Sequence, residues 1–158
     1  MAASESPSGS TPAMRAAALV YVAGLAAHTA DHLRRGLDAV TAGVLWAGNV
    51  STVVGLATVV LVLRGDRRAP AVATSVGFGV GIGVAAVHLL PHWGGLSDPF
   101  VGAKAVGVSG WSWTVVVLEI AGSVLVGATG LRRLRVHPAK GGRRAGPDRG
   151  MFERSAMP

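Results

Sequence analysis

The feature that most constrains this chain is the segment 41–63, which runs for 23 residues without a charged side chain. A helix needs about 20 apolar residues to cross the hydrocarbon core of a bilayer. Arg64, Arg67 and Arg68 follow at once, and basic side chains at the end of such a run hold it at the lipid headgroups. The segment therefore predicts a transmembrane helix.

Three further apolar segments predict the same structure, at about residues 14–33, 69–91 and 112–131. The first reaches full length only if its histidine-containing end lies in the membrane or at its surface. Pro70 suits the first turn of a helix, where no N–H donor is needed. Pro91 removes a donor from the helix and is expected to end or kink it.

These segments predict an all-α membrane protein, with four transmembrane helices forming a bundle over residues 14–135. Composition agrees, because half of the residues are hydrophobic and only 15% are charged, against about 25% in soluble domains. The alternating segments of about ten residues that build a membrane β-barrel are not seen. Residues 1–13 and the basic segment 136–158 are polar and are expected to be disordered tails.

An alternative for the first segment is a cleaved signal peptide. Met14 and Arg15 would begin it, an apolar stretch would follow, and the small residues Ala26 and Ala27 would supply a cleavage site. Met14 could then be the true start of translation. Cleavage would leave a protein with three spans.

The distribution of basic residues predicts the orientation in the membrane. Four spans place both termini on one side together with the 64–69 connection, and that side collects twelve of the 15 basic residues. Only Arg34, Arg35 and Lys104 lie on the other side. Because basic residues favour the cytoplasm, we expect a multi-pass protein of the cell membrane with both termini cytoplasmic.

Ionisable residues gather near the outer ends of the predicted helices. His28, Asp31 and His32 lie close together at the end of the first, and His88 and His92 end the third. Asn49 and Glu119 lie about two turns inside the second and fourth. Polar side chains within a membrane are costly and face the bundle interior, so we expect this group to converge in the outer leaflet.

Imidazole and carboxylate are ligands for zinc, copper and iron, and no cysteine is present to supply a thiolate. The sequence therefore predicts a transition-metal site. Its expected ligands are His28, His32, His88, His92 and Glu119, with Asp31 and Asn49 as residues that orient them. A haem held by two histidines is a less favoured alternative.

Other functions stay open. The buried polar residues could only tie helices together in a structural or accessory membrane subunit, or they could carry protons. No nucleophile or general-base motif is visible, so an enzyme has the least support. Expected partners are the bilayer, anionic lipid at the basic C-terminal tail and a second copy or another membrane protein. Nucleic acid is not expected, because Phe152 is the only aromatic residue in that tail.

Overall fold

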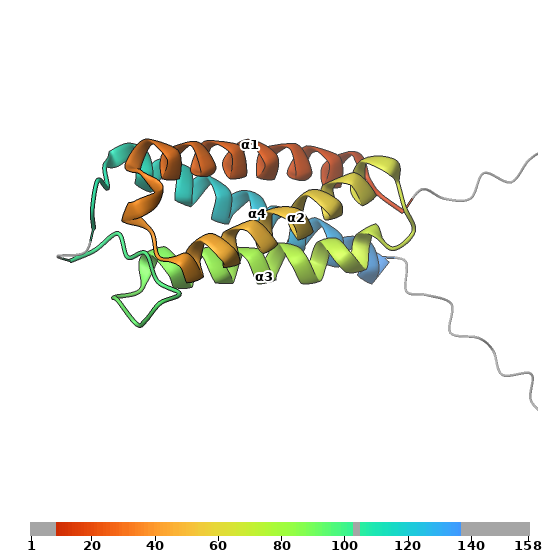
Figure 1. Ribbon diagram of the computed structural model, residues 1–158. Helices are drawn as coiled ribbons and strands as arrows, with labels where there is room; N and C mark the ends of the chain where they lie inside the picture. The colour runs from red at the N-terminus through yellow and green to blue at the C-terminus, as the bar shows by residue number, and fades with distance from the viewer. Residues whose placement is uncertain (1–8, 103–104, 137–158) are drawn as a thin grey trace, which may run out of the picture.

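The computed structural model describes residues 9–102 and 105–136, and these form a bundle of four antiparallel helices (Figure 1). The helices are α1 (Pro12–Arg35), α2 (Ala42–Arg64), α3 (Ala69–Leu89) and α4 (Gly110–Val136), with a short 3-10 turn, η1 (Leu37–Ala39), after α1. Each α-helix is long and apolar enough to cross a membrane, and the described residues contain no strand. The predicted all-α, four-span architecture is confirmed.

Local signals explain where the helices begin and end. The hydroxyls of Thr11 and Thr41 accept hydrogen bonds from the backbone at the starts of α1 and α2, each at 3.2 Å. Gly65 ends α2 in the left-handed conformation, with φ of 68°. Pro91 stops α3 at Leu89, so this helix is slightly shorter than the expected span 69–91.

Two other boundaries also differ from the expected spans. Helix α1 begins at Pro12, inside the segment expected to be an N-terminal tail, and Gly9 already donates a hydrogen bond to the Gly65 carbonyl. Helix α4 continues through the arginines to Val136. A helix outlasts its apolar stretch when long arginine side chains can reach back to the headgroups. The segments 1–8 and 137–158, which hold most of the two predicted tails, lie outside the described residues.

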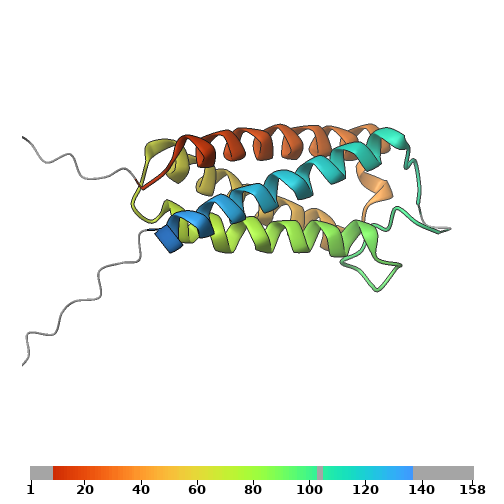
Figure 2. The same ribbon diagram turned by 180° about the vertical axis from the view of Figure 1, so that it is seen from behind.

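The four helices form a ring in which α4 and α2 each lie between α1 and α3 (Figures 1 and 2). The backbones of α1 and α3 are diagonal and do not approach one another closely, and the same holds for α2 and α4. The contacts of α4 with α1 and α3 are much more extensive than those of α2. The tightest part of the core therefore lies along α4.

Glycines make this close packing possible. A Cβ atom at Gly24 would lie 2.8 Å from the backbone of Glu119, and one at Gly122 would lie 2.8 Å from the Tyr21 Cα. Helices α1 and α4 thus meet backbone to backbone, as small residues allow in membrane bundles. Gly24 lies one helical turn before His28 on α1. The contact at Gly24 therefore places the Glu119 backbone one turn deeper in the bundle than His28.

The bundle has two distinct ends. The terminal end carries the start of α1, the connection between α2 and α3, and the end of α4 (Figure 1). The other end carries the end of α1, the start of α2 and the loop 90–109 that joins α3 to α4. We call it the histidine end, because the predicted site residues of α1 and α3 lie there.

Candidate metal site

Three of the predicted histidines come together inside the histidine end. His28 and His32 lie one turn apart on α1, and His88 faces them from the diagonal helix α3. The ring centroids are 4.6 Å apart for His28 and His32, 4.8 Å for His28 and His88, and 5.6 Å for His32 and His88. Each ring offers a nitrogen, and the three nitrogens lie within 4.8 Å of one another. We call this group the histidine trio.

Glu119 holds the first ring of the trio. Its carboxylate, on α4, is hydrogen-bonded to Nδ1 of His28, and both side chains are buried. A carboxylate accepts the Nδ1 proton of a neutral imidazole, which leaves the lone pair on Nε2. Nε2 of His28 is fully buried and has no hydrogen-bond partner among the described residues. Glu119, predicted as a ligand, therefore lies behind His28 and orients it.

The loop 90–109 holds the second ring. The backbone carbonyl of Asp98 lies 2.9 Å from Nδ1 of His88. A carbonyl oxygen can only accept, so Nδ1 carries the proton and Nε2 keeps the lone pair. Metal-binding histidines are commonly fixed in this way, with one nitrogen donating to an oxygen and the other free for the ion.

The third ring is held less firmly. Nδ1 of His32 is buried and makes no hydrogen bond to a described residue, and the Asp98 carboxylate is 3.9 Å away. The same carboxylate oxygen lies 3.6 Å from Nδ1 of His88. The trio thus presents two buried, unpaired ring nitrogens, with a carboxylate at its edge.

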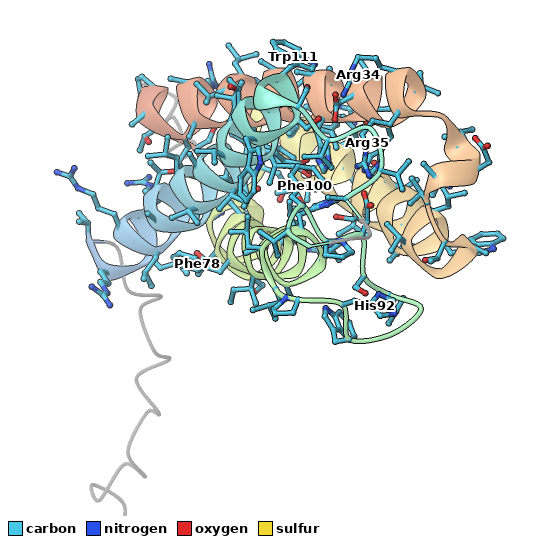
Figure 3. All side chains as sticks on the ribbon, turned by 90° about the vertical axis from the view of Figure 1, so that its left-hand side faces the viewer. Arg34, Arg35, Phe78, His92, Phe100 and Trp111 are labelled. Atoms are coloured by element: carbon cyan, nitrogen blue, oxygen red, sulfur yellow. The ribbon has the colours of Figure 1, made fainter. Side chains whose placement is uncertain are left out.

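Arg35 fastens the loop over the trio. Its guanidinium binds both oxygens of Asp98, at 2.6 and 2.8 Å, and donates to the carbonyl of Val106 at 3.0 Å. It also lies 5.2 Å from the centre of the Phe100 ring, and that ring packs against His88. Figure 3 shows Arg35 and Phe100 over the middle of the histidine end. The two parallel hydrogen bonds between Arg35 and Asp98 are the strongest arrangement that an arginine makes with a carboxylate.

Asp31 has a different partner from the one expected. Its carboxylate accepts a hydrogen bond from Arg34 at 2.9 Å, and no described imidazole bonds to it. Arg34 in turn donates to the Gly107 carbonyl at 2.9 Å and the Ser112 hydroxyl at 3.1 Å. Asp31 therefore fixes an arginine that joins α1 to the loop and to α4, rather than orienting a ligand.

Two predicted site residues lie away from the trio. His92 is exposed on the loop, where its Nδ1 lies 3.0 Å from the Ser97 hydroxyl (Figure 3). It lies past the end of α3, so it leaves the face that it would share with His88 if the helix continued. Asn49 is exposed on the outer face of α2. The expectation that both belong to the site is not met by their positions.

Charge is unevenly balanced in this region. Arg34 and Arg35 pair with Asp31 and Asp98, which leaves Glu119 facing a histidine alone. A carboxylate buried in a low-dielectric bundle favours a cation nearby. The cation can be a proton on the trio or a metal ion held by it.

Sequence reasoning missed Asp98, Arg35 and Phe100. In the sequence, Asp98 is one of only two charged residues between positions 92 and 111, and Arg35 bears only on the orientation in the membrane. The sole signal was an acidic residue in a loop that follows a histidine-bearing helix.

Comparison of the chain with protein-family models, with curated proteins and with solved structures finds no match.

Proposed function

We propose that this is an integral membrane protein that binds one divalent transition-metal ion on the histidine trio. One observation carries the proposal: two buried imidazoles and one half-buried imidazole, from two helices, offer nitrogens within 4.8 Å of one another. Unpaired imidazole nitrogens lose their hydration when they are buried, and this loss costs free energy that an apolar side chain in the same place would not cost. A shared ion would satisfy them.

The chemistry of the donors supports zinc, copper(II) or iron(II). Nε2 of His28, Nδ1 of His32 and Nε2 of His88 would be the ligands. Zinc–nitrogen bonds of 2.0–2.1 Å bring ligand nitrogens to roughly 3.3 Å from one another, so the trio would contract by about an ångström or more around the ion.

Three histidines leave a fourth position on a tetrahedral ion. Asp98 or a water molecule would fill it. An ion suits the trio better than a haem does, because the three rings contact one another, whereas a haem needs a flat porphyrin-sized slot between its two axial histidines.

The basic residues support a location in the cell membrane with both termini in the cytoplasm. The trio would then lie under the outer headgroups, and the ion would arrive from the periplasmic or extracellular side.

The test is the metal content of full-length protein purified in detergent through a tag without histidine. We expect about one bound ion per chain. We expect His28→Ala or His88→Ala to lower affinity by well over the 10–100-fold typical of residues behind the ligands. His92→Ala is the matched control, because His92 lies four residues after His88 but outside the trio. This variant should keep the ion.

A second candidate function is that of a structural or accessory subunit, favoured by the hydrogen bond between His28 and Glu119, which joins α1 to α4. It predicts native protein without stoichiometric metal even after incubation with zinc, copper(II) or iron(II). It also predicts that His28→Ala lowers stability by about 1 kcal/mol, as for other interhelical hydrogen bonds. That combination of results would reject the metal site.

A further inference from the structure

Helix α2 is attached to the bundle less closely than the other helices. It contacts α1 and α3 but not α4, and its buried positions form a narrow strip that includes Gly55, Val59 and Val62. Gly55 is covered by the Tyr21 ring, which fixes the rotation of the helix. The opposite face of α2 therefore points out of the bundle.

This outward face has a regular pattern. Its members are all exposed and alternate in spacing between three and four residues: Trp46, Asn49, Val53, Leu56, Val60 and Leu63. We call them the outer stripe. A seam of that spacing lets two helices pack along their length with a slight left-handed twist. The apolar side chains of the outer stripe can also face lipid without a cost in free energy, so they do not by themselves indicate a partner.

Asn49 is the exception in the outer stripe. It is the eighth residue of α2, roughly 10 Å from the start of a helix about 35 Å long. The hydrocarbon core is only about 30 Å thick, so Asn49 lies inside the apolar layer. Its amide has no hydrogen bond to any described residue. A primary amide facing lipid leaves two donors and an acceptor unpaired.

The hydroxyl of Ser75, which is exposed on α3, also has no hydrogen bond to a described residue, but it can form one within its own helix. A serine in a helix can donate to the carbonyl four residues earlier and so satisfy itself within its own turn. The larger amide of asparagine cannot pair all of its groups in this way. Of these two lipid-facing polar side chains, Asn49 is the one that needs a partner outside the chain.

We propose that α2 is the interface of a homodimer, in which the Asn49 amides of two copies hydrogen-bond to each other. Copies inserted in the same orientation are related by a two-fold axis along the membrane normal, so both Asn49 residues lie at the same depth. An amide is complementary to itself, because each copy offers a donor and an acceptor. The apolar members of the outer stripe pack on either side of this pair.

The proposed dimer does not depend on the histidine trio, so the dimer and the metal site can be tested independently. The outer stripe lies on α2, whereas the trio is built by α1 and α3. A dimer that forms without metal would leave the proposed function untouched, and a metal-binding monomer would reject only the dimer.

Cysteine crosslinking of full-length protein in bilayers tests the interface, because the chain has no native cysteine. Val53→Cys places a thiol in the outer stripe, and Val54→Cys places one at the same depth but about 100° around the helix. We expect oxidation to link Val53→Cys into dimers and to leave Val54→Cys mostly monomeric. If the Ile82→Cys variant, with its thiol on α3, formed disulfide-linked dimers and the Val53→Cys variant did not, the proposal would be overturned.

The amide is tested by the dimerisation constant, measured by energy transfer between labelled copies as lipid is added. We expect Asn49→Leu to weaken association about five- to tenfold, as for loss of intramembrane hydrogen bonds. Ser75→Ala on α3 should leave it unchanged. Unaltered helix content in Asn49→Leu would show that the fold is retained. A monomeric native protein, or a dimer insensitive to Asn49→Leu, would overturn the proposal.

Discussion

At the scale of single residues, Glu119 decides how firmly the first ring of the trio is held. Replacing it by Gln keeps an oxygen that can accept from Nδ1 of His28 but removes the charge. We therefore expect Glu119→Gln to weaken metal binding about tenfold and Glu119→Ala to weaken it more, within the 10–100-fold range for residues behind a ligand. Competition titration against a chelator of known affinity measures both. Equal affinity in all three proteins would mean that Glu119 does not act on His28.

The predicted site residues that the structure brings together lie within helices, where spacing in the sequence decides which face they share. His28 and His32 share a face because they are four residues apart, and His88 is still helical. Asn49 and Asp98 could not be placed in this way. The rotation of α2 depends on the Tyr21–Gly55 contact, and the position of Asp98 depends on the arginine that binds it. Neither contact is local in sequence.

At the scale of the elements, the contact between α1 and α4 at Gly24 sets the height of Glu119 against His28. An added methyl group would overlap the α4 backbone, with the Glu119 Cα and N atoms each 2.8 Å away. We expect Gly24→Ala to lower the free energy of unfolding by about 1–3 kcal/mol, as overpacking does. Gly83→Ala is the control, since nothing lies within 4 Å of its added Cβ. Unfolding in a graded series of denaturing detergent compares them, and equal stability would argue against this packing.

The existence of four helices was readable because uncharged runs of about 20 residues have few other solutions. Their packing was not, since these helices carry apolar residues on nearly every face and no single stripe marks the interior. The glycines that bring α4 close to its neighbours became meaningful only once their partners were known. Proline marks one helix end in the sequence, since α3 ends at Leu89, two residues before Pro91.

At the scale of the whole molecule, the orientation in the membrane can be tested with single cysteines. Leu37→Cys and Gly95→Cys lie at exposed positions of the histidine end, and Arg67→Cys lies at an exposed position of the terminal end. We expect a membrane-impermeant thiol reagent applied to intact cells to label the first two and not the third, because basic residues are retained in the cytoplasm. Labelling of Arg67→Cys alone would reverse the orientation. A mature protein that begins after Ala27 would show cleavage of the first helix.

The diagonal placement of α1 and α3 has a thermodynamic consequence. Their backbones do not approach closely, yet the trio draws its histidines from both. An ion held there would act as a cross-brace between opposite corners of the bundle, and unfolding would have to release it. By mass action, free metal at one hundred times its dissociation constant would add about 2.7 kcal/mol to the stability. The melting temperature of this protein would then report the free-metal concentration around it.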